Sequence, residues 1–392
     1  MDYTDQELQT TQLATQYAQL VALCAAIPKA DESALAAAQE RLDSLTKPRQ
    51  SLGQIETLLL RLAASTGQVC PRLDRRAILL VAADHGVAAE GVSAYPQAVT
   101  AQMVLNFLAG GAAINALAAA ADARIIHVDA GVASAMPDHP ALHRLNIRRG
   151  TGNIAREPAM DRHEALAALL AGVTIVEAEW RNGLDLLALG EMGIANTTVA
   201  AALTSAFTGA PPSSTVGRGT GISDAMLEHK RQVIATALQR STDLLAAMPN
   251  SDTTSAATWL TSTQSQALNR LCQLGGLEIA VLTGAILAAA MRRIPVLLDG
   301  YITTSAALVA ADLAPDVRLH LFAAHRSHEP GHALALAHLG LTAEAHAGPL
   351  LQLDLRLGEG SGAALAMPLL VSATRLMREM ATFDEAGVSK KK

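Results

Sequence analysis

Cysteine and aromatic residues are scarce in this chain of 392 residues. Only three cysteines occur, Cys24, Cys70 and Cys272, and none of them belongs to a CxxC pair. A disulfide framework and a cysteine zinc site are therefore disfavoured. Aromatic residues make up 3% of the chain, whereas hydrophobic residues make up 50%. The expected core consists of alanine, leucine, valine and isoleucine, which suits close packing of helices on a sheet.

Positive charge and long apolar runs are also lacking. The net charge is -6, and no long basic run precedes the three lysines at 390–392, so we expect no nucleic-acid binding. The N-terminal MDYTDQELQT is acidic and polar, unlike a signal peptide. The most apolar stretch, Leu277–Met291, is too short to cross a bilayer and contains Glu278. We expect a cytoplasmic protein without a membrane span.

The apolar patterns that are present predict an α/β fold. Residues 1–65 and the segment after Gly362 show helical spacing, and between them short apolar runs alternate with alanine-rich helical stretches. We predict a doubly wound, mainly parallel sheet with flanking helices in a large catalytic domain over residues 66–362. Residues 1–65 and 363–392 are expected to form a small helical lobe.

Six apolar runs, read as strands, each end in a polar residue, and five of them carry glycine beside it. They are RAILLVAADHG, ARIIHVDAG, LDLLALGEMG, RIPVLLDGY, VRLHLFAAHRS and LQLDLRLGEG. Ligands of open α/β sheets bind outside the carboxyl ends of the strands. The six ends therefore predict one polar rim, at which we expect Asp84, Asp299 and Ser327 to bind substrate.

Two carboxylates stand out at this rim. Glu359 lies between glycines in LRLGEGSG, where the chain leaves a predicted strand and enters a helix, and Glu191 lies similarly in LGEMG. An acid without a structural role at such a place is a candidate proton acceptor. Asn196 and Thr197 follow Glu191 at the start of the next predicted helix, and we expect at least one of them to cap that helix.

The segment STVGRGTGISDAMLEHK contains alternating glycines ahead of a predicted helix. Such a loop offers backbone N–H groups to an anion. Neither the GxGxxG spacing nor the Walker spacing is met, so a single phosphate is favoured over a dinucleotide, and Lys230 could add positive charge. A tight loop capped by Ser223 or Asp224 explains the pattern equally well.

His85, next to Asp84, fits a metal ligand, a base or a hydrogen-bonded residue at the end of a strand, and the last role is the usual one. No HExxH or comparable ligand spacing and no GxSxG elbow occurs in the chain. We therefore expect no metal site and no cofactor.

Together these motifs resemble the nicotinate-nucleotide–dimethylbenzimidazole phosphoribosyltransferases of cobalamin lower-ligand synthesis. The resemblance runs from about residue 77 to residue 389. It is carried by AADHGV, YPQAVTAQMVLNFLAGGAAINALA, GEMGIANTT, VGRGTGISD, GGLEIAVLTGAIL, PVLLDGYITTSAAL and LRLGEGSGAALAMPLL. One departure is AHRSHEPGH, where the family often reads SHRSAEPGH, so that Ala324 replaces a serine and His328 an alanine.

The resemblance implies a reaction. The phosphoribosyl group of nicotinate mononucleotide moves to 5,6-dimethylbenzimidazole with inversion at the anomeric carbon, which yields α-ribazole 5′-phosphate and nicotinate. Glu359 is implied to be the general base, and we expect Glu191 to stabilise the oxocarbenium-like sugar. The family likeness also implies a homodimer.

The same resemblance implies where the substrates bind. The aromatic ligand is expected near Tyr95, Pro96 and Gln97, with Leu357 beside Glu359 also in contact with substrate. The phosphate is expected near Gly193, Gly219 and Lys230. Three alternatives remain open: transfer to another azole or to a phenol, a nucleotide-binding protein without turnover, and a structural partner in a cobamide-synthesis assembly.

Overall fold

The computed structural model describes residues 3–219, 221–247 and 260–389. In this part of the chain six strands form one sheet in the order β3-β2-β1-β4-β5-β6, and every neighbouring pair is parallel. The strands are β1 (Arg76–Ala83), β2 (Ala123–Gly131), β3 (Leu142–Arg144), β4 (Leu186–Met192), β5 (Val296–Leu298) and β6 (Leu321–Ala323). The doubly wound parallel sheet predicted from the sequence is confirmed.

The strand order reverses between β1 and β4. From β1 the chain winds outward through β2 to β3, and from β4 it winds outward in the other direction through β5 to β6. In open α/β sheets a ligand binds outside the carboxyl ends of the strands at such a switch point. The segments that follow Ala83 and Met192 are therefore placed to form a site.

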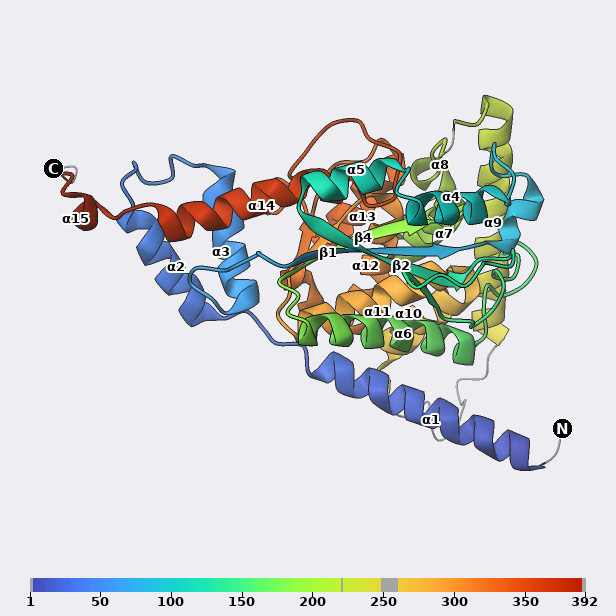
Figure 1. The fold of residues 1–392 in the computed structure, drawn as a ribbon. Helices are drawn as coiled ribbons and strands as arrows, with labels where there is room; N and C mark the ends of the chain where they lie inside the picture. Colours follow the sequence, from blue (N-terminus) through green and yellow to red (C-terminus); the bar gives the residue numbers. More distant parts are fainter. Residues whose placement is uncertain (1–2, 220, 248–259, 390–392) are drawn as a thin grey trace.

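Helices cover both faces of the sheet, as Figure 1 shows. Leu79 and Val81 of β1 belong to the core shared with α6 and α11, whereas Ile78 and Leu80 belong to the core shared with α5 and α14, because successive side chains of a strand point to opposite faces. The helices are α1 (Tyr3–Ala25), α2 (Glu32–Ser44), α3 (Gln54–Thr66), α4 (Val99–Leu108), α5 (Ala113–Ala120), α6 (Arg162–Arg181), α7 (Asn196–Thr208), α8 (Pro212–Thr215), α9 (Asp224–Ala247), α10 (Ser262–Leu274), α11 (Leu277–Met291), α12 (Tyr301–Leu313), α13 (Pro330–Leu339), α14 (Ser361–Glu379) and α15 (Phe383–Ala386), with 3-10 helices at Gly86–Glu90 and Pro315–His320.

One stretch of the described chain, Val99–Ala120, has the length and composition of a membrane span. In the fold it is two helices, because α4 ends at Leu108 and α5 begins at Ala113 after a turn at Gly110, whose φ is +77°. Helices of 10 and 8 residues fall short of the roughly 20 residues that cross a bilayer.

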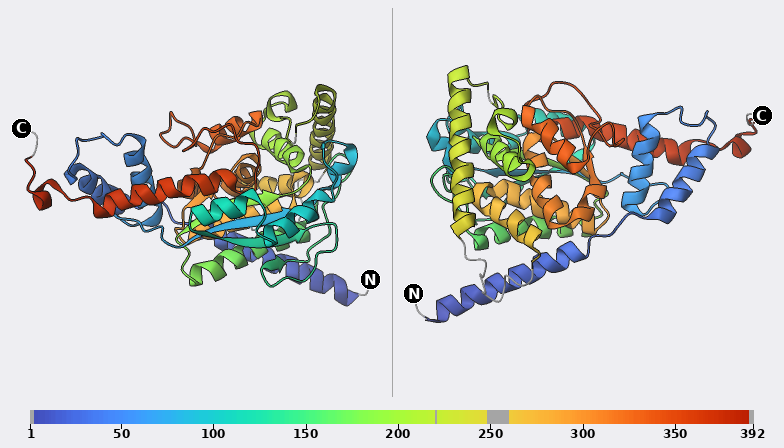
Figure 2. Two further views of the ribbon diagram at one scale, coloured as in Figure 1. Left: turned by 45° about the horizontal axis from the view of Figure 1, so that its top comes forward. Right: turned by 180° about the vertical axis from the view of Figure 1, so that it is seen from behind.

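The small lobe consists of α2 and α3 with the second half of α14 (Figures 1 and 2). Arg41 of α2 donates a hydrogen bond from Nε to the carbonyl oxygen of Met377 in α14, at 2.7 Å. Helix α1 lies apart from this lobe, although we expected it there from the sequence. Its residues Tyr17 and Leu20 pack into the large domain, and Arg162 of α6 donates a hydrogen bond to the Tyr17 hydroxyl at 2.8 Å. Apolar burial against α6 and α11 decides the position of α1.

The prediction of a strand over LQLDLRLGEG is wrong. Residues 352–358 form an irregular loop, and Leu351 makes only an isolated parallel bridge with His325. Leu351 packs against the core on the α14 side, but Leu353 is 52% and Leu357 is 55% exposed. The sixth strand is instead β3, whose sequence LHR contains no apolar run that could mark it as a strand.

Candidate active site

A cavity of about 430 Å³ opens at the carboxyl edge of the sheet. Its walls come from the segments that follow β1, β4, β5 and β6 and from the loop before α14. The expected site residues that line it are Glu359, Glu191, Tyr95, Gly193, Gly219, Ser327 and Leu357. Asp84, Pro96, Gln97, Lys230 and Asp299 lie outside the lining.

Glu359 immediately precedes the N-cap of α14 in an unusual backbone conformation. Its φ is +64°, between Gly358 at +82° and Gly360 at +84°. A non-glycine residue in this left-handed region costs about 1–2 kcal/mol, so the surrounding structure must hold it there. Its side chain is buried, and Oε2 has no hydrogen-bond partner among the described residues. Burial, and then the nearby charge of Asp299, raise the pKa of Glu359 to about 7, which suits a proton acceptor at neutral pH.

The raised pKa of Glu359 makes stability depend on pH. An unfolded glutamate ionises near its ordinary pKa of 4.5, whereas the folded protein keeps the proton until about pH 7. Stability from this group is therefore present below pH 4.5 and is lost as pH rises to about 7, by about 2–3 kcal/mol. We expect Glu359→Gln, which cannot ionise, to raise Tm by a few degrees over the wild type at pH 8 and by little at pH 4. Thermal unfolding at both pH values, with the exposed Glu40→Gln as control, measures this. Equal differences at the two pH values would contradict it.

Glu191 follows Gly190 on β4 and reaches the same cavity. Its Oε2 accepts a hydrogen bond from Nδ2 of Asn196, and its Oε1 lies against Gly358, where any side chain would collide with it. Burial, and then the negative charges of Asp299 and Glu278, raise the pKa of Glu191 to about 8. In the ligand-free protein at neutral pH this carboxyl is mostly protonated.

The helix that follows, α7, is not capped as expected. Its N-cap is Ala195, with φ of +74° and no side-chain cap, so Asn196 lies inside the helix and its amide is used by Glu191. The predicted cap at Asn196 or Thr197 is therefore wrong. The side chain of Asn196 donates to the buried carboxyl of Glu191 instead of capping the helix.

Gly190 explains how the two glutamates come together. A Cβ at this position would lie 2.6 Å from the carbonyl oxygen of Glu359. Because glycine has none, the backbone of Glu359 lies directly on β4, next to Glu191.

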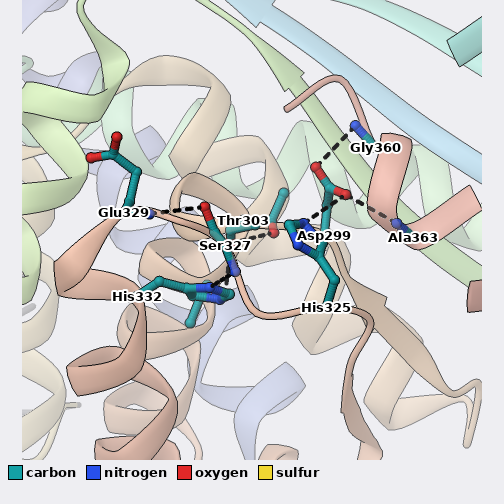
Figure 3. A network of polar contacts seen from close by, with 10 residues as sticks. Asp299, Thr303, His325, Ser327, Glu329, His332, Gly360 and Ala363 are labelled. Atoms are coloured by element: carbon teal, nitrogen blue, oxygen red, sulfur yellow. Dashed lines mark hydrogen bonds and ion pairs between the residues drawn. The ribbon is translucent and has the colours of Figure 1, made fainter. Parts of the chain in front are cut away.

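Asp299 lies behind the cavity wall, and Figure 3 shows its contacts. It is 1% exposed and accepts hydrogen bonds from the backbone N–H groups of Gly360 and Ala363 at 3.2 and 3.0 Å. Nε2 of His325, which does line the cavity, lies 3.6 Å from its Oδ1. Both oxygens of the Asp299 carboxylate are thus occupied by backbone N–H groups at the start of α14.

Ser327 lines the cavity, and its backbone N–H donates to Nδ1 of His332 at 2.9 Å. Of the two residues that depart from the family pattern, Ala324 is fully buried in the apolar core on the α14 side, and its N–H donates to Leu298. His328 is exposed on the rim. Neither side chain reaches the cavity lining.

The glycine-rich loop places Gly219 over a buried ammonium group. Lys230 of α9 is 1% exposed, and its Nζ donates to Oγ1 of Thr197 at 2.8 Å. Burial lowers the pKa of Lys230 to about 8, against a smaller upward contribution from Glu329. The carboxylate of Glu329 accepts the N–H of Gly219 at 2.8 Å. Ser223, whose hydroxyl accepts the N–H of Met226, caps the start of α9, so loop capping and anion binding are compatible here.

Asp84 and His85 follow β1 and are buried inside the protein. Asp84 accepts the N–H of Ala133 at 2.8 Å, and His85 forms an ion pair with Glu278 of α11 at 2.9 Å, both side chains being fully buried. The charge of Glu278 raises the pKa of His85 although burial opposes it. Gln97 donates weakly to the His85 carbonyl oxygen, at 3.4 Å. These residues support the loops at the switch point from behind.

Tyr95 and Leu357 form an apolar rim at the cavity mouth. Each is 55% exposed and each lines the cavity. Pro96, next to Tyr95, is exposed outside the lining. A flat apolar ligand that entered between Tyr95 and Leu357 would cover this surface.

Several polar residues at the site were not singled out from the sequence, among them His325, Glu329 and Arg356 of the cavity lining. Glu278, which pairs with His85 behind the cavity, was not singled out either. Glu278 had a signal, since it is a single acid in an apolar run that forms a completely buried helix. A buried acid needs a partner, but nothing in the sequence pointed to His85. His325 and Glu329 lie in a histidine-rich segment where the sequence does not separate lining residues from rim residues.

Comparisons with known proteins agree with this site. A family model described as "Phosphoribosyltransferase" matches residues 27–388. The chain is 48% identical over 361 residues to the nicotinate-nucleotide–dimethylbenzimidazole phosphoribosyltransferase of Chloroflexus aurantiacus, covering 92% of this chain and 96% of that protein. It is 49% identical over 360 residues to the protein of the same name from Thermus thermophilus, covering 92% and 99%. The crystal structure of CobT from T. thermophilus matches with a TM-score of 0.82 at 48% identity, over 92% of this chain and all of that one.

Proposed function

Since this chain belongs to the nicotinate-nucleotide–dimethylbenzimidazole phosphoribosyltransferase family, we propose that it moves the phosphoribosyl group of nicotinate mononucleotide to 5,6-dimethylbenzimidazole with inversion at the anomeric carbon, Glu359 acting as general base. The products are α-ribazole 5′-phosphate and nicotinate. The enzyme class, a phosphoribosyltransferase, follows from the family itself.

The observation that carries the proposal is the buried, unpaired carboxyl of Glu359 at the switch point of the sheet. When one benzimidazole nitrogen attacks the sugar, the opposite N–H becomes acidic because positive charge develops on the ring. A carboxylate with a pKa near 7 and a free oxygen can accept that proton. The glycines on both sides let the chain around Glu359 pack against Glu191 and Gly190, which holds the carboxyl at the cavity.

Glu191 is proposed to stabilise the sugar. Nicotinate leaves from a cationic pyridinium, so its departure needs no general acid, but the ribose gains oxocarbenium character. A carboxylate close to the anomeric carbon stabilises that charge. Burial favours the protonated form of Glu191, and a cationic donor ring beside it favours its ionised form.

Lys230, Gly219 and Gly193 are proposed to hold the 5′-phosphate. Lys230 is close behind the Gly219 loop, and Gly193 leads into the N-terminal region of α7. A helix N-terminus and an ammonium group both favour an anion. Burial lowers the pKa of Lys230 to about 8, and the charge of Glu329 offsets only part of that shift. A phosphate nearby would stabilise the charged ammonium further.

The test is turnover by the purified protein. We expect nicotinate mononucleotide and 5,6-dimethylbenzimidazole to give nicotinate and α-ribazole 5′-phosphate in equal amounts by chromatography, with the α configuration shown by NMR. Turnover with only adenine or a phenol as acceptor would support the alternative acceptors. If the protein bound the nucleotide but gave no turnover with any of these acceptors, it would be a nucleotide-binding protein and not a transferase.

We also propose a homodimer located in the cytoplasm. The apolar rim of Tyr95 and Leu357 is surface that a ligand or a second copy would cover. Light scattering of the purified protein gives the mass in solution, and a monomer at micromolar concentration would contradict the dimer.

A further inference from the structure

Asp299 occupies a particular place relative to Glu359. Its two carboxylate oxygens accept the N–H of Gly360, directly after Glu359, and that of Ala363, one turn further on. An aspartate from the end of β5 thus does what an N-cap side chain normally does for a helix, because the N-cap residue of α14 is Gly360 and has no side chain. The helix dipole adds to the attraction for this negative charge.

The same bonds constrain the strained backbone of Glu359. Three successive residues, 358–360, have left-handed φ values, and only the middle one carries a side chain. Such a conformation persists only where its surroundings determine it. The bond from the Gly360 N–H to Asp299 fixes the chain on one side, and the contact of Glu359 with Gly190 fixes it on the other.

Asp299 is itself held by a rigid set of neighbours (Figure 3). The ring of His325 lies between Asp299 and His332, with the two imidazole centroids 6.2 Å apart, and Gly362 leaves no space beside it. His332 is fully buried and neutral, since burial lowers its pKa to about 3. Because its Nδ1 accepts from Ser327, its Nε2 carries the proton and donates to Oγ1 of Thr304 at 3.0 Å.

From this arrangement we infer that Asp299 is a positioning residue for the transfer reaction, and not a ligand of the substrate: it fixes the main chain around Glu359 and supplies the negative charge beside that base. This inference rests on the proposed role of Glu359.

The electrostatic part follows from the groups around the two carboxyls. Apart from burial, Asp299 is the main cause that raises the pKa of Glu359. The other charged or titratable groups around this region are Glu191 of β4, Glu278 of α11 with its partner His85, His325 and Glu329 after β6, Arg356 in the loop before Gly358, and Tyr95 and Tyr301 of the cavity lining. Removing the charge of Asp299 should therefore lower the proton affinity of Glu359.

The experiment compares wild type with Asp299→Asn, which keeps the shape and one accepting oxygen but removes the charge. Asp299→Ser, with an uncharged hydroxyl acceptor, is a second variant should the first fold poorly. The carboxyl of Glu359 is titrated by NMR of protein carrying ¹³C-labelled glutamate, with Glu359→Gln identifying its signal. Asp129→Asn is the matched control, because Asp129 is also a buried aspartate at a strand end that accepts a backbone N–H, but it lies at the end of β2.

We expect the midpoint of Glu359 to fall by about 0.5–1 pH unit in the Asp299 variant and to stay unchanged in the Asp129 control. Amide exchange over residues 358–366 should become faster. kcat should fall by about 10- to 100-fold with little change in KM for nicotinate mononucleotide, and the acidic limb of the kcat/KM profile should move to lower pH.

An unchanged midpoint together with a raised KM would overturn the inference and make Asp299 a substrate ligand. If the midpoint were unchanged and only amide exchange became faster, Asp299 would be a structural cap alone, and the inference would again be overturned. The titration needs no turnover: if the wild type made no α-ribazole 5′-phosphate while the midpoint still depended on Asp299, only the proposed function would fail.

Discussion

Replacing Glu359 by glutamine is expected to lower kcat/KM for α-ribazole 5′-phosphate formation by about 10²- to 10⁴-fold, the usual contribution of a general base. Glutamine keeps the size and the backbone position but cannot accept the benzimidazole proton. Since Glu359 and Glu191 must both be ionised, kcat/KM of the wild type should rise with pH through about 7 and level off above about 8. Initial rates measured between about pH 5.5 and 9 check both expectations.

Two controls separate loss of the base from a misplaced loop. The exposed Glu344→Gln should have wild-type kinetics. With 1-methylbenzimidazole as acceptor there is no N–H to lose, so wild type and Glu359→Gln should turn over at similar rates. If the variant is as defective with this acceptor as with 5,6-dimethylbenzimidazole, the carboxyl does not act by taking the proton.

The second large effect is expected at Glu191. Glu191→Gln should lower kcat by about 10- to 100-fold, because the neutral amide cannot stabilise the developing positive charge of the sugar as a carboxylate does. Since the pKa of Glu191 is about 8 in the free protein, ionisation next to the pyridinium should release a proton when nicotinate mononucleotide binds at pH 7. Calorimetric titration in two buffers of different ionisation enthalpy counts this proton.

The number of protons released on nucleotide binding and the value of kcat are two independent tests of Glu191. The variant should release less proton on binding the nucleotide, whereas Asp129→Asn should release as much as the wild type. An unchanged kcat in Glu191→Gln would remove Glu191 from the chemistry. An unchanged proton release in the variant would mean that a group other than Glu191 supplies the proton.

Stability and function oppose each other at these two carboxyls. Burial that raises a carboxyl pKa costs folding free energy at neutral and higher pH, and here Glu191 and Glu359 share one cavity with Asp299 beside it. Hydrogen bonds from Asn196 to Glu191 and from Gly360 and Ala363 to Asp299 offset part of this cost.

The sequence by itself determined the doubly wound sheet and the rim on which the site is built. Short apolar runs that end in Asp84, Glu191 and Asp299 followed from local patterning, because a buried parallel strand must be apolar and must end where the chain turns. The placement of Glu359 between two glycines was also a local signal. It survived even though the preceding strand did not exist, since the glycines on either side of Glu359 mark a turn whether or not a strand precedes it.

Only the tertiary structure decided which rim residues face the cavity. Asp84 and Asp299 follow strands as expected, but one oxygen of Asp84 accepts the N–H of Ala133 and both oxygens of Asp299 accept the N–H groups of Gly360 and Ala363, which lie 49, 61 and 64 residues away along the chain. The buried pair of His85 and Glu278 joins the end of β1 to α11 across a still longer stretch of sequence. Sequence patterns record periodicity over a few residues, whereas these partners are set by how helices and strands pack, and that packing determines which carboxylate caps a helix and which stays free to take a proton.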